Sequence, residues 1–509
     1  MLEKLKQKLQ KQALVVLVFV LGAIASKIFA PFNGIALGYV AFISFLMILF
    51  YEKRSFFANF KLGYVFGVTF FVCCFSWIAN ALLVDGEKFA TFVPLVLWAI
   101  GAFFGLFVGI PAGFTCFAKN IYQRAISFCL MFSIFEWVRS FIFTGFPWNL
   151  LGSALAFDIR LISGAAYIGT YGLSLMLLLL MSAVAIFLMG VWQKKLYKIS
   201  LVFMFVSVIF FGWSGSKFQS VPSGDFVVRL VQPSIPQTFK WDEDLALKNF
   251  NKHLSLTAKE GIEKVKLIVW GETASPYMLD RDEFSLRELM SVIPNDALLV
   301  TGVLRAGIEN GDLAIYNSMF AIDNVRGIRD YYDKVHLVPF GEYLPFREYL
   351  PDFMSPVANI VGDMYSGEKY KLIKVDGFPN MGGAICYESI FPKEVIDYKN
   401  KPEILLVLAN DGWYGVSAGP YQHLVASQLR AVEEGVSVVR SANTGVSAVI
   451  NPNGEIAGRI ELNENGFIDV NLPKDLTIDT LYGKYGNLIV FLLWFVFALV
   501  FLSLEKDKK

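Results

Sequence analysis

The sequence predicts two different structures in one chain, a multi-span α-helical membrane domain and an α/β layered domain. Of the 509 residues, 55% are hydrophobic and only 17% are charged, whereas about 25% are charged in an average globular domain. The apolar residues concentrate in 13–215 and again in 487–504, and the region between them has an ordinary globular composition. We therefore expect a membrane domain at 1–216, a soluble domain at 217–486, and a closing helix with a short tail at 487–509.

The membrane domain is expected to cross the bilayer seven times before the soluble domain begins, and an eighth crossing follows it. A spanning helix needs about 20 predominantly apolar residues. The amino-terminal segment superficially resembles a signal peptide, but no small-residue cleavage site follows it, so we expect it to be retained. The predicted spans are approximately 13–30, 35–51, 62–84, 91–118, 125–143, 164–190, 196–215 and 487–504.

The distribution of lysine and arginine in the loops predicts the orientation of these spans. Basic residues lie in the amino-terminal segment, in the loops that contain Lys53, Lys119 and Lys194, and in the carboxy-terminal EKDKK. The alternate loops are poorer in basic residues. Both termini are therefore expected in the cytoplasm, and seven crossings place the soluble domain in the periplasm of a bacterium.

One predicted span carries two ionisable residues, Glu136 and Arg139. Charged groups at this depth are costly unless they are paired, and a separation of three on a helix lets them pair on one face. We interpret them as an internal ion pair that fixes helix packing. The alternative is a role in a pocket for a lipid headgroup.

The soluble domain is predicted to alternate short strands with helices, which is typical of an α/β layered fold. Each strand is a short apolar or β-branched run bounded by turn residues, and the last helix ends at a C-cap glycine. The predicted strands are 226–231, 267–270, 298–303, 318–322, 384–387, 404–408, 437–439 and 447–450, and the predicted helices are 242–261, 285–292 and 421–435.

Composition also narrows the possible partners and cofactors. The net charge is +1 and no segment forms a dense basic stripe, so nucleic acid is not an expected partner. Cys73, Cys74, Cys116 and Cys129 lie in apolar runs, where a thiol behaves as a small hydrophobe. No CxxC or Cys/His cluster occurs, so we expect no metal. Cys386 is the only cysteine in the polar half.

Three polar residues occur where buried strands end or in polar loops, namely Glu272, Lys334 and Cys386. In α/β sheets, side chains converge on a site at such strand ends. A carboxylate can deprotonate a thiol, and an ammonium group can lower the pKa of the thiol and stabilise an oxyanion. Considered alone, Glu272 could be a helix cap, Lys334 a surface charge and Cys386 a packed core thiol. We interpret His336 and His423 as structural or supporting residues.

Three blocks that contain these residues resemble the motif blocks of the nitrilase superfamily, and the order Glu, Lys, Cys is the same. They are 269–274, 332–343 and 385–388. Together with the preceding spans, further segments resemble the apolipoprotein N-acyltransferase family of the bacterial inner membrane. These segments are 231–241, 410–415, 136–139 and 144–148.

The resemblance implies an αββα sandwich for the soluble domain and a two-step acyl transfer. Glu272 would take the proton of Cys386, whose thiolate would attack the sn-1 ester of a phospholipid, phosphatidylethanolamine in this interpretation. The α-amine of the diacylglyceryl-cysteine of an apolipoprotein would then attack the thioester, and Lys334 would hold the oxyanion. No cofactor is implied, and a monomer is expected. Supporting or substrate-binding roles are implied for Trp241, Glu342, Tyr387 and Glu388.

Two other functions fit parts of the sequence. A membrane-tethered amidase or nitrilase would need the same three residues, but one anchor would suffice for it. A transporter with a periplasmic binding domain is disfavoured because no inverted repeat is visible. The segment 343–351 is rich in aromatic residues and proline. It is either an ordinary packed loop or a mobile lid that dips Phe346 and Leu350 into the membrane surface.

Overall fold

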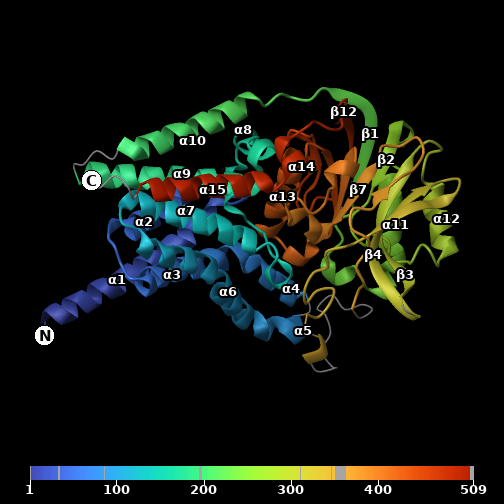
Figure 1. The fold of residues 1–509 in the computed structure, drawn as a ribbon. Coiled ribbons are helices and arrows are strands. Elements are labelled where there is room, and N and C mark those ends of the chain that lie inside the picture. The colour runs from blue at the N-terminus through green and yellow to red at the C-terminus, as the bar shows by residue number, and fades with distance from the viewer. Residues whose placement is uncertain are drawn as a thin grey trace. The chain divides into compact units, whose positions relative to one another are not determined.

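The computed structural model describes the chain in two compact units (Figure 1). The described residues are 2–32, 35–84, 86–193, 198–309, 311–345, 347–349 and 363–504. The first unit comprises Met1–Ala79, Phe89–Phe218 and Tyr485–Lys509, and the second comprises Asn80–Lys88 and Gln219–Lys484. A short segment from the amino-terminal half, Asn80–Lys88, thus belongs to the same unit as the strands. Phe346 and Leu350 of the predicted lid lie outside the described residues.

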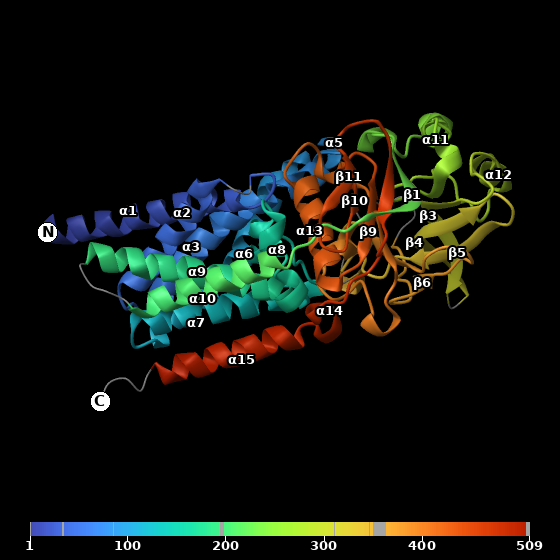
Figure 2. The same cartoon turned by 90° about the horizontal axis from the view of Figure 1, so that it is seen from above.

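The first unit is built from helices, and each predicted span overlaps one of them (Figure 2). Among the described residues, five helical stretches are long and apolar enough to cross a membrane, while α2 and α15 are shorter apolar helices. The number of crossings stays a prediction. The main helices are α1 (Leu2–Ala25), α2 (Ala36–Tyr51), α3 (Phe56–Phe75), α6 (Val93–Phe114), α7 (Ile121–Val138), α9 (Ala165–Trp192), α10 (Lys198–Ser216) and α15 (Leu488–Ser503). Of the short helices, α8 (Ile159–Ile162) belongs to this unit. Most of α4 (Ala79–Leu83), α5 (Gly86–Phe89) and α14 (Leu481–Tyr485) belongs to the second unit.

Helices α3 and α6 approach each other closely because glycines lie at their contact. A Cβ atom on Gly67 of α3 would lie 3.0 Å from the Cα of Gly105 on α6, and one on Gly63 would lie 2.4 Å from the Cβ of Ala112. Small residues at such contacts allow the backbones of apolar helices to pack without a large hydrophobic driving force.

Glu136 and Arg139 hold the segment that follows α7. Oε1 of Glu136 accepts a hydrogen bond from the backbone N–H of Leu151 at 2.6 Å. An Nη atom of Arg139 donates to the carbonyl of Trp148 at 2.8 Å. Both buried side chains therefore bind backbone groups of the segment that follows α7, and they fix a loop as well as a helix.

The second unit is an αββα sandwich, as predicted. One six-stranded sheet has the order β12-β1-β2-β3-β4-β5, and the other has the order β11-β10-β9-β8-β7-β6. The first sheet consists of β1 (Ser223–Gln232), β2 (Val265–Val269), β3 (Leu298–Glu309), β4 (Asp312–Asp323), β5 (Gly327–Asp333) and β12 (Gly466–Pro473). The second consists of β6 (Leu372–Ile373), β7 (Met381–Ile385), β8 (Ile404–Ala409), β9 (Ser437–Ala442), β10 (Ser447–Ile450) and β11 (Ile456–Ile460).

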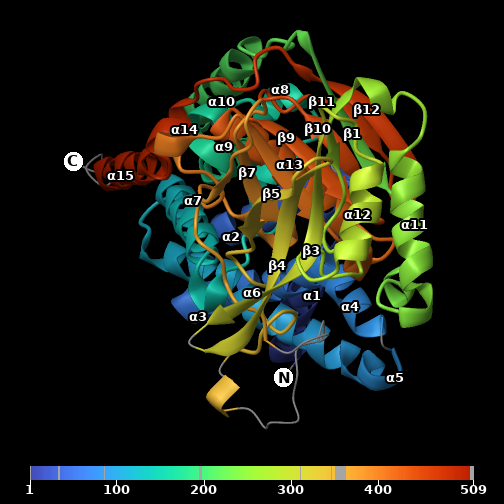
Figure 3. The same ribbon diagram turned by 90° about the vertical axis from the view of Figure 1, so that its right-hand side faces the viewer.

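Side chains that alternate between the two faces of each sheet form the core between the sheets and the outer layers under the helices. Successive side chains of a strand point to opposite faces of the sheet, so Val269 of β2 packs in the core between the sheets while Ile268 faces outward. Helices α11 (Ala246–Thr257) and α12 (Glu283–Ser291) cover the outer face of the first sheet (Figure 3). Helix α13 (Gly419–Glu434) covers the second.

Parallel strands at the centre of each sheet bring the polar residues together. Strands β1, β2 and β3 are parallel neighbours in one sheet, and β7, β8 and β9 are parallel neighbours in the other. Glu272 follows β2, Cys386 follows β7 and Asp411 follows β8. Carboxyl ends of parallel strands lie at one edge of a sheet, so these side chains meet.

Candidate active site

Cys386 lies at a strained turn directly after β7. It begins the 3₁₀ helix Cys386–Ile390 with φ of +52°, and its side chain is only 5% exposed. A residue with a Cβ atom in this left-handed region stores about 1–3 kcal/mol of strain, which is found mostly at functional sites. Gly383 of β7 allows close packing beneath the turn, because a Cβ there would lie 2.5 Å from the ring of Tyr332.

Glu388 holds this turn against the segment that follows Lys334. Its Oε2 accepts a hydrogen bond from the backbone N–H of Ile385 at 2.6 Å. Its Oε1 accepts from the backbone N–H groups of Val335 (2.8 Å) and His336 (3.0 Å). Burial raises the pKa of Glu388, although these backbone donors act in the opposite direction. The described contacts of this carboxylate therefore position the turn and the lysine loop together.

Lys334 lies between two carboxylates. Its Nζ is 2.9 Å from Oε1 of Glu342 and 3.4 Å from Oε1 of Glu272. The amide Nδ2 of Asn317 on β4 donates to the same two oxygens, at 2.9 and 2.8 Å. Burial by itself lowers the pKa of Lys334, but Glu342 and Glu272 outweigh it and raise this pKa above its ordinary value. The two carboxylates therefore favour the ammonium form of Lys334.

Cys386 is held as a thiol in this arrangement. Burial raises its pKa, and the nearby carboxylate of Glu272 raises it further, while Lys334 and the backbone N–H of Asn410 act to lower it. The hydroxyl of Tyr414 lies 3.7 Å from Sγ. The thiol consequently needs a base to react at neutral pH, and Glu272 is the carboxylate whose charge acts on it most strongly.

A buried network supports the nucleophile from behind. Nε2 of His423 on α13 lies 2.9 Å from the carbonyl oxygen of Cys386, and Nδ1 lies 2.7 Å from Oδ1 of Asp411. An Nη atom of Arg440 donates to Oδ2 of Asp411 at 2.7 Å. Burial by itself raises the pKa of Asp411, but Arg440 and His423 outweigh it and lower this pKa. Burial, together with Arg440, lowers the pKa of His423.

The same network is a poor cation site. Cys386, Asp411 and His423 offer donor atoms within 4.8 Å of one another. The guanidinium of Arg440 already binds Asp411 and lies 3.0 Å from Nδ1 of His423. A metal ion there would have to displace a positive charge from a fully buried carboxylate, so these donors serve the protein's own side chains.

The remaining predicted residues lie around this centre. The buried ring of Tyr387 packs edge-to-face on His336 and Phe391, with ring centroids 5.5 and 5.1 Å apart. Trp241 is half-buried, and the ammonium of Lys240 lies 5.9 Å from the centroid of its ring.

A segment from the amino-terminal half reaches the loop beside the nucleophile. Nδ2 of Asn80 donates to the backbone carbonyl of Tyr414 at 2.6 Å. Gly415, in a positive-φ conformation, lets this contact form, because a Cβ there would lie 3.1 Å from the same amide nitrogen. Sequence patterns gave no indication of this contact, which joins residues 334 positions apart.

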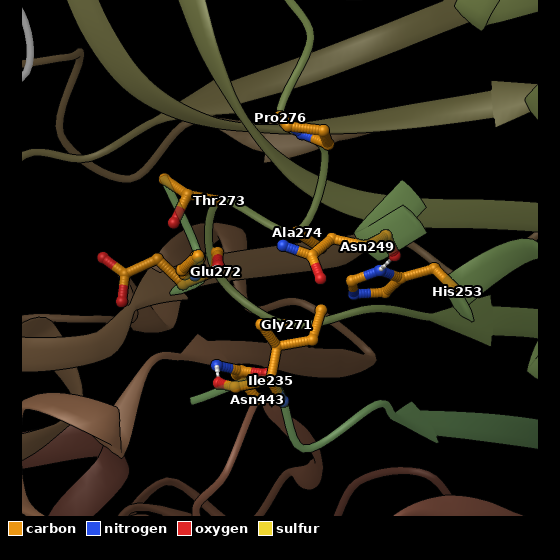
Figure 4. Close-up of a pocket in the computed structure, with 10 residues that line it drawn as sticks. Ile235, Asn249, His253, Gly271, Glu272, Thr273, Ala274, Pro276 and Asn443 are labelled. Atoms are coloured by element: carbon orange, nitrogen blue, oxygen red, sulfur yellow. Dashed lines mark hydrogen bonds between the residues drawn. The ribbon is translucent and has the colours of Figure 1, made fainter. Parts of the chain in front are cut away.

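A small cavity lies beside Glu272 (Figure 4). It is lined by Asn249 and His253 from α11 on one side and by Gly271 and Asn443 on the other. In Figure 4 the carboxylate of Glu272 points away from His253. The cavity is therefore next to the main chain of Glu272 rather than at its reactive oxygens.

Comparison with known proteins places the whole chain in one family. Residues 21–185 match the family described as apolipoprotein N-acyltransferase N-terminal domain, and residues 227–481 match carbon-nitrogen hydrolase. The apolipoprotein N-acyltransferase of Rickettsia typhi is 33% identical over 485 residues, which cover 94% of this chain and 95% of the relative. The chain belongs to the apolipoprotein N-acyltransferase family. The Rickettsia bellii member is 35% identical, covering 96% of this chain and 97% of its own.

Solved structures of nitrilase-superfamily proteins align with about half of this chain. A mutant amidase from Nesterenkonia sp. AN1 aligns with a TM-score of 0.35 and 16% identity, covering 53% of this chain and 99% of the amidase. Nit3 of Saccharomyces cerevisiae aligns with a TM-score of 0.37 and 20% identity, covering 51% and 93%. As a member of the apolipoprotein N-acyltransferase family, the protein is a bacterial membrane acyltransferase that N-acylates lipoproteins.

Proposed function

We propose that the protein carries one acyl chain on Cys386, from the sn-1 position of a phospholipid to the α-amine of a diacylated apolipoprotein. The observation that carries this proposal is the cluster of Glu272, Lys334 and Cys386 at the strand ends, with Lys334 3.4 Å from Glu272. A buried thiol next to a carboxylate and an ammonium has a base and an oxyanion partner for acyl transfer.

In the first step, Glu272 accepts the proton of the Cys386 thiol and the sulfur attacks the ester carbonyl carbon. The negative charge that develops on the carbonyl oxygen is stabilised by the ammonium of Lys334. When the tetrahedral intermediate collapses, the carbon–oxygen bond breaks and the leaving alkoxide takes the proton from Glu272. The products are a thioester on Cys386 and a lysophospholipid.

In the second step, the amine of the apolipoprotein attacks the thioester carbonyl. Glu272 now accepts a proton from the attacking nitrogen, and Lys334 again stabilises the oxyanion. The carbon–sulfur bond breaks, and the departing thiolate recovers the proton from Glu272. An amide has formed and the free thiol is restored, so the cycle balances without a cofactor.

Four other residues support these steps. Glu342 holds Lys334 at 2.9 Å and keeps its ammonium charged in both steps. Glu388 ties the nucleophile turn to the lysine loop through its backbone contacts. Trp241 and Tyr387 are proposed to contact substrate.

The proposed membrane topology follows from the distribution of basic residues among the loops. The membrane domain at 1–216 and the helix at 487–509 anchor the enzyme, both termini face the cytoplasm, and the catalytic domain at 217–486 lies in the periplasm. The donor is phosphatidylethanolamine, and the enzyme acts as a monomer. Both substrates are lipid-anchored, so a site beside the membrane surface can receive each of them.

A transfer assay with purified full-length protein tests this function. The substrates are phosphatidylethanolamine with an isotope-labelled sn-1 chain and a synthetic diacylated lipopeptide, and mass spectrometry detects the triacylated peptide. We expect labelled product with the wild type and with Cys116→Ala, a control cysteine in the first unit. We expect at least about a 1,000-fold loss with Cys386→Ala and with Glu272→Gln. Substantial turnover by folded Cys386→Ala would overturn the proposal.

A further inference from the structure

Lys240 is a second buried lysine at the active site, and the two steps above do not use it. It follows the 3₁₀ helix Gln237–Phe239 and is only 7% exposed. Its Nζ donates a hydrogen bond to the backbone carbonyl of Glu272 at 2.8 Å. Among the residues that the structure describes, no carboxylate lies within ion-pair distance of this ammonium, in contrast to Lys334.

The loop that carries Lys240 is tied to the strand ends of the nucleophile sheet. Ile235 and Asn443 exchange two hydrogen bonds, from the Ile235 N–H to Oδ1 at 2.9 Å and from Nδ2 to the Ile235 carbonyl at 2.7 Å. Nδ2 of Asn410 donates to Oε1 of Gln237 at 2.8 Å. Asn410 and Asn443 directly follow β8 and β9. The ammonium is therefore held in place by contacts on the same sheet as Cys386.

The charged and titratable groups around Lys240 are few. The charges of Glu272 and Cys386 act to raise the pKa of Lys240, but burial dominates and lowers this pKa to about 8. His253 of α11 lines the same cavity as Lys240. Burial, with a smaller contribution from Lys240, lowers the pKa of His253 to about 4. His253 is therefore neutral at pH 7, and Lys240 is the cation on this side of Glu272.

The charge balance of the site explains why such a cation is retained. Glu272 and Glu342 supply two negative charges, and Lys334 supplies one positive charge. When Cys386 of the resting enzyme loses its proton to solvent, a further negative charge is added to this buried cluster. An ammonium buried without an ion pair is destabilising, and such destabilising groups are found where function requires them.

We propose that Lys240 is a positioning residue whose charge promotes ionisation of Cys386 and whose hydrogen bond fixes the main chain of Glu272. This inference rests on the proposed function, in which Cys386 is the nucleophile. The ammonium compensates the thiolate in the resting enzyme, before any lipid has bound. Its effect is thus measurable on the thiol itself, without acyl transfer.

Alkylation of Cys386 by iodoacetamide tests the proposal. The rate is measured between pH 6.5 and 9.5 on detergent-solubilised full-length protein, by mass spectrometry of the peptide that contains Cys386. Lys240→Met removes the charge, and the hydrogen bond with it, and keeps the apolar stem. We expect it to slow alkylation about tenfold at pH 6.5. The difference should shrink above about pH 8, where the lysine of the wild type loses its proton.

Two further variants separate the effect of the Lys240 charge on alkylation from any effect on the structure around it. Lys240→Gln keeps a donor for the Glu272 carbonyl but has no charge, so it should react as slowly as Lys240→Met. Lys248→Met, at an exposed position of α11, should match the wild type at every pH. If Lys240→Met does not fold, the comparison of Lys240→Gln with the wild type still tests the proposal, because the rate difference between these two proteins should shrink above about pH 8.

The inference is overturned if folded Lys240→Gln alkylates at the wild-type rate throughout this range. It is also overturned if the difference between the two proteins does not change with pH. Neither result affects the proposed function, because alkylation uses no lipid. Failure of the proposed function would instead appear as transfer that continues in Cys386→Ala.

Discussion

The hydroxyl of Tyr332 lies 3.0 Å from Oε1 and 3.1 Å from Oε2 of Glu388. Tyr332 is on β5, two residues before Lys334, and Glu388 is two residues after Cys386. The pair therefore joins the strand that delivers the ammonium to the turn that delivers the thiol, and the two sheets each contribute one partner.

This relationship predicts different effects for two substitutions. Glu388→Ala leaves the backbone N–H groups of Ile385, Val335 and His336 without their acceptor, at about 1–3 kcal/mol for each buried group. Tyr332→Phe removes only one donor and should lower the free energy of unfolding by about 1 kcal/mol. Thermal unfolding in detergent should therefore rank the wild type above Tyr332→Phe and Glu388→Ala lowest. Equal stability of the two variants would show that Glu388 does not join the two segments.

Asn317 provides a second prediction, because its amide binds Glu272 and Glu342 at once. Asn317→Asp would place a third carboxylate beside these two and beside the thiol, which should lower kcat about 100-fold. Asn317→Ala removes the donor without adding charge, and about a tenfold loss is expected. Steady-state acyl transfer measures both variants. If Asn317→Asp were as active as Asn317→Ala, the electrostatic part of this account would be wrong.

The position of His423 predicts that its substitution lowers the rate of acyl transfer without lowering the affinity for substrate. Its Nε2 lies 2.9 Å from the carbonyl of Cys386, and it is fully buried, so it has no access to substrate. His423→Gln should lower kcat about tenfold and leave KM for both substrates unchanged, because the nucleophile is less well placed. A change confined to KM would instead indicate that α13 takes part in substrate binding.

The raised pKa of Cys386 gives a prediction for the resting enzyme. Burial raises this pKa above the ordinary value of a thiol, so the thiolate is a minor species at neutral pH and its fraction increases with pH. Iodoacetamide should therefore alkylate Cys386 more slowly than free glutathione at pH 7.5, and the rate should still be rising at pH 9. A plateau near pH 7 would mean that the thiolate is already formed in the resting site.

The regular central elements could be predicted from the sequence. Strand β10 occupies 447–450 as predicted, and α13 ends before Gly435, whose φ of +59° makes it the predicted C-cap. The predicted strand 384–387 is too long, because the positive φ of Cys386 ends β7 at Ile385. The sequence does not indicate strand β5 (Gly327–Asp333), because its polar segment GIRDYYD contains no apolar run. This strand lies at the edge of its sheet.

The site was predictable only where a motif marked it. The fold brings Glu272, Lys334 and Glu342 together as one cluster. The charges of Glu272 and Lys334 act on the pKa of the Cys386 thiol. Asp411, His423 and Arg440 come from three separate elements, and no local pattern connects residues that meet only through the fold. In the sequence, Lys240 is marked only by its place in the segment 231–241, which resembles the family. Its burial and its bond to the carbonyl of Glu272 are properties of the packed structure.

The most direct test of the central claim is detection of the acyl group on Cys386. Purified full-length protein is incubated with phosphatidylethanolamine alone, digested, and analysed by mass spectrometry. We predict one fatty acyl group on the peptide that contains Cys386, sensitive to neutral hydroxylamine as a thioester is, and absent from Cys386→Ala. Transfer to lipopeptide by a preparation in which Cys386 never carries an acyl group would contradict the account.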